Sequence, residues 1–196
     1  MIKAKLLLAT VLALASMATW ATTTTYTFGT LLSGSYSPST SFATLSETTT
    51  DNVHYNFTLT LNGLSSAFSS GAFVGSMAVD SSTSTSLPST SGVSGGVASV
   101  SASHGGAPGG SWDFRDTFGG GSDRLTGSET VSWTSTFSQP VNLQTFALHV
   151  QGLSSLQGGS AWYGAVAVVP EPETYALMTL GLGLAGGLLR RRSRAS

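Results

Sequence analysis

Apolar and polar residues alternate along much of the middle of this chain, which predicts β-strands with one buried face. In the range 53–61, apolar residues occupy every odd position and polar residues every even one. A period of two places successive side chains on opposite faces of a strand. Asn62 and Gly63 follow directly and form a favoured turn pair. Further strands are expected in the ranges 25–32, 71–80, 96–103, 129–138, 141–150 and 161–169.

The same alternation predicts which faces of the later strands point towards a core. The expected core faces hold Val131, Trp133 and Phe137; Phe146, Leu148 and Val150; and Trp162, Gly164, Val166 and Val168. Buried aromatic residues contribute much of a core's packing energy. Only Trp112, beside a glycine-rich loop, and Tyr163, opposite Trp162, are therefore expected as exposed aromatic residues.

About seven strands with turn signals between them predict an all-β domain, an antiparallel β-sandwich of the jelly-roll or immunoglobulin-like type. The composition agrees, because the middle of the chain is rich in Ser, Thr and Gly and poor in the residues that favour helices. Two stretches, 81–91 and 104–111, are expected to be loops. The first is a low-complexity run of Ser and Thr, and the second is rich in glycine.

The N-terminus has the three parts of a secretory signal peptide. Lys3 and Lys5 provide the positive charge, residues 6–18 are apolar, and Thr19-Trp20-Ala21 places small side chains where a signal peptidase reads them. We expect cleavage after Ala21, with cleavage after Ala18 as the alternative. The apolar run is too short to favour a permanent membrane anchor. Residues 1–21 are thus assigned to the signal peptide and residues 22–169 to one secreted domain.

The C-terminal residues 170–196 differ in character from the domain that precedes them. Pro170, Glu171 and Pro172 are followed by the apolar run 175–189 and then by Arg190, Arg191, Arg192 and Arg194. A helix of that run would be roughly 22 Å long, shorter than the ~30 Å hydrocarbon core of a bilayer. Arginine side chains that reach towards the membrane interface lengthen the span of this helix. Their positive charge favours placing the C-terminal end on the cytoplasmic side. The segment is expected to be a marginal transmembrane helix; the alternative, a buried core helix, does not explain four terminal arginines.

This tail resembles the PEP-CTERM sorting signal of Gram-negative bacteria, in which the tripeptide, an apolar helix and a basic end occur in this order. The resemblance implies that exosortase recognises the chain near Pro170–Pro172 and removes the tail. It also implies export, transient anchoring in the inner membrane, and a place in the cell envelope or the extracellular polysaccharide matrix of a biofilm. The domain is then expected to be a structural or adhesive matrix protein.

The charges of the expected mature domain exclude some function classes. Residues 22–169 contain only two basic side chains, Arg115 and Arg124, against seven acidic ones, which leaves a net charge of −5. The absence of a basic patch makes nucleic-acid binding unexpected. The chain has no cysteine, so zinc–thiolate sites and thiol catalysis are excluded. No cofactor is expected.

Most of these charges gather in residues 112–129, where Trp112, Asp113, Asp116 and Asp123 are candidate ligand residues. Three arrangements are possible: a calcium site made by the three aspartates, a surface turn in which Asp116 pairs with Arg115 or Arg124, or a loop packed over Phe114 and Phe118. We expect a solvated loop and no metal, because calcium requires six or more oxygen ligands. Residues 114–118 also spell F-x-D-x-F, after which a subgroup of these sorting-tail proteins is named; we expect that motif nearer the mature N-terminus.

Catalysis is not expected. Many serines and three scattered histidines allow a catalytic triad only on paper, and there is no G-x-S-x-G nucleophile motif. A carbohydrate-binding module is the alternative function, because sugar sites use exposed aromatic residues such as those expected at Trp112 and Tyr163.

Overall fold

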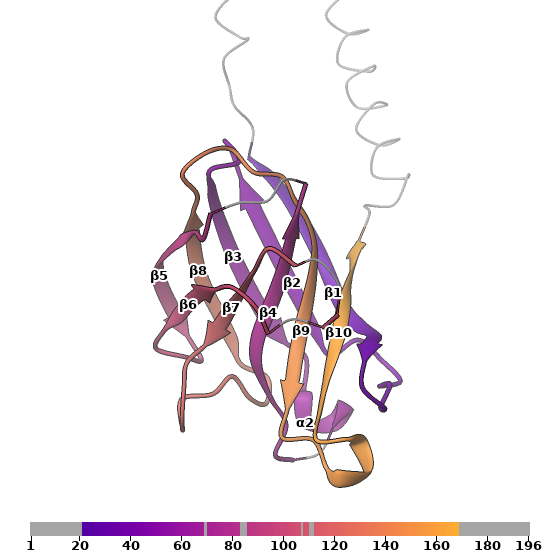
Figure 1. Cartoon of the computed structure of the whole chain (residues 1–196). Helices are drawn as coiled ribbons and strands as arrows, with labels where there is room; N and C mark the ends of the chain where they lie inside the picture. The colour runs from indigo at the N-terminus through magenta and orange to yellow at the C-terminus, as the bar shows by residue number, and fades with distance from the viewer. Residues whose placement is uncertain (1–20, 69, 83–85, 107, 110–111, 169–196) are drawn as a thin grey trace, which may run out of the picture.

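A computed structural model describes residues 21–168, apart from 69, 83–85, 107 and 110–111 (Figure 1). The expected signal peptide, except Ala21, and the tail from residue 170 lie outside this part of the chain. Its helical elements are the short α2 (Leu64–Ala67) and the 3-10 turn η1 (Ser155–Gln157). Its strands are β1 (Thr22–Ser33), β2 (Ala43–Thr49), β3 (His54–Leu61), β4 (Phe73–Ser81), β5 (Ser89–Gly95), β6 (Val100–Ser103), β7 (Phe114–Phe118), β8 (Thr130–Thr136), β9 (Leu143–Gln151) and β10 (Ser160–Val168).

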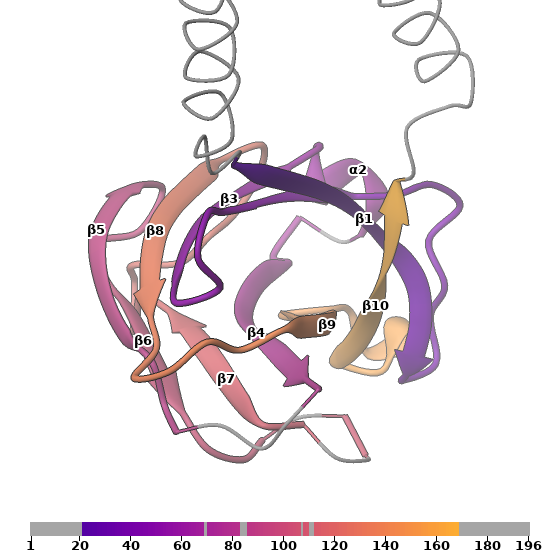
Figure 2. The same ribbon diagram turned by 90° about the horizontal axis from the view of Figure 1, so that it is seen from above.

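These strands form one antiparallel sheet in the order β5-β8-β3-β2-β1-β10-β9-β4-β7-β6. The sheet is rolled up until its two edge strands meet, so that it is nearly barrel-like (Figure 2). The Thr90 hydroxyl of β5 donates a hydrogen bond of 2.6 Å to the Val100 carbonyl of β6. The all-β antiparallel prediction is confirmed. The expected division into two packed sheets is not observed, because strand pairing continues through all ten strands.

The rolled shape depends on long strands that bend while remaining paired. β1 pairs with β2 through residues 22–28 and with β10 through residues 25–33. The β1–β10 register shifts between Phe28 and Thr30 and again between Leu31 and Ser33. Such bulges bend a strand and increase its twist. Strand β1 can therefore bend the sheet while its pairing continues. In a β-sandwich, a loop would instead carry the chain from one sheet to the other.

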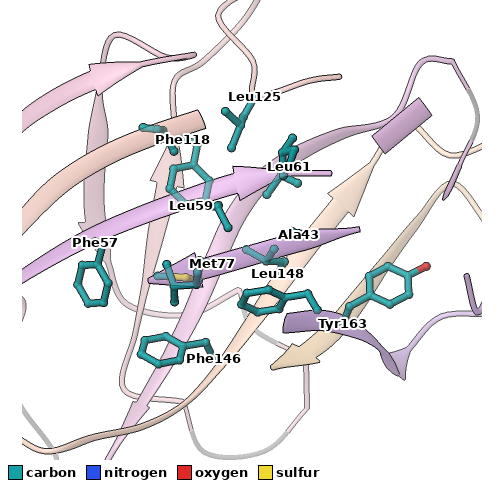
Figure 3. Close-up of a cluster of buried hydrophobic side chains, with 14 of the residues drawn as sticks. Ala43, Phe57, Leu59, Leu61, Met77, Phe118, Leu125, Phe146, Leu148 and Tyr163 are labelled. Atoms are coloured by element: carbon teal, nitrogen blue, oxygen red, sulfur yellow. The ribbon is translucent and has the colours of Figure 1, made fainter. Parts of the chain in front are cut away.

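The inner face of the rolled sheet encloses the hydrophobic core (Figure 3). Phe57 stacks on Trp133 with ring centroids 5.0 Å apart, and Phe42 meets Tyr163 edge to face at 5.1 Å. Aromatic pairs of this kind add stabilisation beyond the area they bury. The predicted core faces of residues 129–138 and 141–150 are confirmed: their members are buried, namely Val131, Trp133, Phe137, Phe146, Leu148 and Val150.

The predicted core face of the last strand is wrong. Tyr163 is fully buried and its hydroxyl donates a 2.8 Å hydrogen bond to the Tyr36 carbonyl. Val166 and Val168, which were assigned to the core, are 54% and 48% exposed. Trp162 lies on the outer face and is nevertheless 8% exposed, because Trp112 packs against its cluster there. Both faces of the first half of β10 are covered, so alternation could not distinguish them.

Three strands were not expected from the sequence. β2 lies between the predicted first two strands, β5 begins within the stretch assigned to a loop, and β7 lies in the acidic segment. β5 consists of Ser, Thr, Gly and one Val, and it pairs with β8 alone. Most of its side chains are exposed, so its sequence carries no apolar alternation. Of the expected strand 96–103, only residues 100–103 form β6.

Candidate functional site

The acidic segment forms a strand at its centre instead of a solvated loop. In β7, Phe114, Asp116 and Phe118 point into the core, and Asp116 has no exposed surface. Their alternation with Arg115 and Thr117 is that of a strand with one buried face. The expectation that the acids of this segment face water is therefore wrong for Asp116.

The three aspartates proposed as calcium ligands are not brought together. The Asp113 carboxylate accepts hydrogen bonds from the Ser81 backbone N–H at 2.8 Å and from the Ser81 hydroxyl at 2.5 Å. The Asp123 carboxylate accepts one from the Ala98 N–H at 3.0 Å. Asp116 faces the core and pairs with neither arginine. Within the described residues, no group of three metal-ligating side chains occurs.

Trp112 is half-buried and lines a depression of about 360 Å³ together with Leu32, Ser33, Pro108 and Gly109. Its indole N–H donates a 2.9 Å hydrogen bond to the Pro108 carbonyl. Its ring packs against a small cluster on the outer face of the sheet, formed by Ala78, Ala147 and Trp162. Trp112 thus fastens the chain before β7 to the sheet. Tyr163, which was also expected to be exposed, is fully buried and therefore cannot stack on a sugar, whereas Trp112 keeps part of its surface exposed.

Two carboxylic acids lie inside the rolled sheet, Asp116 and Glu47. Burial raises the pKa of Asp116 to about 7, and the indole N–H of Trp133 lowers it in part. Burial likewise raises the pKa of Glu47 to about 7, against a lowering by the Tyr26 hydroxyl. Both oxygens of Asp116 and one of Glu47 lack a well-formed hydrogen bond. A buried acid in this condition favours its neutral form.

The outer face of the sheet carries a groove where β4, β7 and β9 adjoin. One depression of about 230 Å³ is lined by Gly75, Ser76, Arg115, Thr117, His149 and Gln151. A second depression of similar volume shares Gly75, Thr117 and Gln151, and continues over Phe73 and the turn of residues 119–124. Because the two share three residues, we treat them as one feature, called the outer groove below.

The polar side chains of the outer groove are held by their neighbours. The His149 ring stacks on Trp162 with centroids 4.5 Å apart and an interplanar angle of 7°. Burial, and secondarily the charge of Arg115, lowers the pKa of His149, so its imidazole is neutral at neutral pH. Arg115 donates a 3.3 Å hydrogen bond to the Gly106 carbonyl. Arg124 donates one of 2.5 Å to the Gly121 carbonyl, and its guanidinium lies 4.4 Å from the Phe73 ring centroid.

Sequence reasoning did not identify this groove. Its polar side chains come from three strands that are far apart in the chain and become neighbours only through the register: His149 pairs with Ser76, and Ser76 pairs with Thr117. The available signal was the polar face of residues 141–151, where His149 and Gln151 alternate with buried Leu148 and Val150. That pattern indicates which face of the strand points outwards, but it does not identify the neighbouring strands.

Comparison with known families concerns the C-terminal tail. Residues 168–193 match the family model described as PEP-CTERM protein-sorting motif. The chain carries a PEP-CTERM sorting signal. The matched range includes Pro170, Glu171, Pro172 and Arg190–Arg192, and Arg194 follows it directly.

The match confirms the resemblance and indicates a protein that is exported, sorted by exosortase and associated with the cell envelope. It covers only the tail and assigns no F-x-D-x-F subgroup. No curated protein and no solved structure matches the chain. The described residues contain no helix of the length and apolar character needed to cross a bilayer; the expected C-terminal helix lies beyond them.

Proposed function

We propose that this protein is a non-catalytic structural or adhesive component of the extracellular polysaccharide matrix, delivered through its PEP-CTERM tail. The tail first anchors the chain in the inner membrane, and exosortase then cleaves near Pro170–Pro172. The family match at residues 168–193 is the observation that carries the proposal. It motivates a biofilm role in a Gram-negative cell envelope.

The position of the strand ends supports this route of delivery. Thr25 near the start of β1 pairs with Val168 at the end of β10, so both ends of the folded domain lie side by side (Figure 1). The turn η1 and helix α2 lie at the opposite end of the molecule. A chain tethered by its tail would then present that opposite end away from the membrane.

Cell fractionation with and without exosortase tests the proposal. Without exosortase, the envelope fraction should contain the full-length form that still carries residues 170–196. With exosortase, mass spectrometry of the protein leaving the inner membrane should find a C-terminus near Pro170–Pro172. Release of a chain that ends at Ser196 would contradict processing. A reporter fused to residues 170–196 that remains only in the soluble fraction would contradict anchoring.

A further inference from the structure

The charges of the domain are distributed unevenly around the outer groove. Within residues 22–169 the net charge is −5, yet the only two basic side chains, Arg115 and Arg124, both line this groove. Asp123, whose carboxylate accepts a hydrogen bond from the Ala98 N–H, shares the lining, so the groove carries two positive charges against one negative charge. Two of the seven acids, Asp116 and Glu47, are buried, so five acids and both arginines lie outside the core. The basic side chains of this mildly acidic surface therefore gather at one depression, which favours an anionic ligand there.

The guanidinium groups retain donors that a carboxylate could use. Arginine has five N–H donors, arranged in a planar fork that fits a carboxylate. Among the described residues, Arg115 and Arg124 each donate one hydrogen bond to a backbone carbonyl. The Arg115 Nε–H is buried, so a ligand would reach only the terminal nitrogens of this guanidinium group. The backbone contacts hold both side chains in place while leaving most of their donors for a ligand.

The rest of the lining suits a ligand that is rich in hydroxyl groups. Thr117 offers a hydroxyl, Gln151 an amide, and His149 a neutral imidazole fixed by stacking on Trp162. These groups both donate and accept hydrogen bonds, as hydroxyls require. The groove is also elongated, because its two depressions adjoin through Gly75, Thr117 and Gln151. A ligand longer than one sugar unit could therefore contact both depressions.

The groove lies towards the end of the domain opposite to the tail. Gln151 of the groove pairs with Ser160 at the start of β10, whereas the tail follows Val168 at its end. Eight residue steps of β-strand separate these positions by roughly 26 Å. A ligand outside the membrane could therefore reach the groove while the tail is still anchored.

We propose that the outer groove binds a segment of an acidic polysaccharide, with Arg115 and Arg124 holding carboxylates of uronate units and with Thr117, His149 and Gln151 bonding their hydroxyls. The inference deepens the proposed matrix role and rests on it. It assigns the contact with the matrix to the outer groove and identifies the ligand as an anionic polysaccharide.

Titration calorimetry on the full-length protein in mild detergent tests the inference with polygalacturonate, free galacturonate and neutral dextran. We expect binding of polygalacturonate at least tenfold tighter per uronate than binding of galacturonate, and no binding of dextran. Each of Arg115→Gln and Arg124→Gln should weaken polygalacturonate binding about tenfold, the typical effect of losing a charge-assisted hydrogen bond. Arg124 is exposed, so its substitution reports on the groove even if Arg115→Gln disturbs folding.

Asn56→Asp is the matched control, because it makes the same change in net charge on β3, outside the outer groove. Asn56 is exposed and accepts a 2.8 Å hydrogen bond from Thr134, which aspartate can also accept. This variant should bind normally. Three results would overturn the inference: equal loss in Asn56→Asp and the arginine variants, unchanged binding in both arginine variants, or dextran binding equal to that of polygalacturonate. Equal affinity for galacturonate and the polymer would overturn the assignment to a polysaccharide.

A fractionation control separates this inference from the proposed delivery. The double variant Arg115→Gln/Arg124→Gln should still reach the envelope and be cleaved near Pro170–Pro172, since the tail is unchanged. Loss of sugar binding with normal cleavage supports the groove assignment. Normal sugar binding by a protein that is never cleaved would contradict the delivery proposal and leave the groove assignment supported.

Discussion

At the scale of single residues, the least expected feature is a pair of carboxylic acids in an otherwise apolar interior. Asp116 lies between Phe114 and Phe118 on the inner face of β7, and Glu47 lies on the inner face of β2. Phe114 and Phe118 alternate with polar residues, but the aspartate between them, at position 116, breaks the apolar face that a buried strand is expected to show. The strand was therefore missed because its buried face is not wholly apolar.

We predict that Asp116→Asn stabilises the protein at alkaline pH. The folded-state pKa of Asp116 is raised to about 7, above the ordinary 3.8 of the unfolded chain. The folded state therefore holds a proton that the unfolded state has released, and stability is lost as pH rises from about 4 through about 7. Asparagine cannot ionise, so at pH 9 the variant should exceed the wild type by on the order of 2–4 kcal/mol.

Urea unfolding at pH 4 and pH 9 measures this difference. At pH 4 the two proteins should be nearly equal, which serves as the internal control. Glu47, whose pKa is raised, lowers the free energy of unfolding of both proteins as pH rises. His149, whose pKa is lowered, has the opposite effect on both proteins below about pH 6.5. Both effects cancel in the comparison of variant with wild type. A variant less stable than the wild type at pH 9 would contradict the prediction.

At the scale of elements, the sequence predicted those strands that have one apolar and one polar face. β3, β8 and β9 are of this kind, and their core faces follow from alternation alone. The failures have separate physical causes: β5 has almost nothing to bury, β7 buries an acid, and β10 is covered on both faces. The groove could not be predicted for a further reason. Its strands β4, β7 and β9 are neighbours in the sheet but are not consecutive in the sequence.

The two faces of β10 give a direct test of the corrected assignment. Tyr163→Ala should cost about 3–5 kcal/mol, as expected for loss of a buried aromatic ring, because Tyr163 is fully buried against Phe42 and Phe68. Val166→Ala should change stability by less than about 0.5 kcal/mol, since Val166 is 54% exposed. Urea unfolding of both variants checks the pair. The reverse order would restore the original prediction for this strand.

The contact between the edge strands β5 and β6 can be tested with one isosteric change. Thr90→Val removes the hydroxyl that donates to the Val100 carbonyl and should cost about 1 kcal/mol. Thr130→Val is the matched control, because its hydroxyl bonds Thr60 at an exposed position, and it should cost much less. Equal effects of the two substitutions in urea unfolding would show that this contact does not hold the edges together.

At the scale of the whole molecule, the sequence and the structure give different parts of the function. The tail carries its information in local sequence order, so the sorting signal could be identified from residues 170–196 alone. The outer groove depends on the pairing of β4 with both β7 and β9, which brings Arg115 of β7 near His149 of β9 and the turn that holds Arg124. The sorting signal was therefore predictable from the sequence, whereas the proposed binding surface was not.

The proposed anchoring through the tail predicts how the domain is oriented at the membrane. The chain has no cysteine, so one introduced cysteine is a unique label site. Leu156 lies in η1 and is 95% exposed, whereas Val166 is 54% exposed and lies two residues before the end of β10.

In envelopes lacking exosortase, Val166→Cys should react with a bulky maleimide polymer several-fold more slowly than Leu156→Cys, relative to a small maleimide. The bilayer next to the tail hinders a large reagent more than a small one. After cleavage the excess hindrance at Val166→Cys should disappear, because the domain no longer stands on the membrane. A ratio unchanged by cleavage would show that the end of β10 does not face the bilayer.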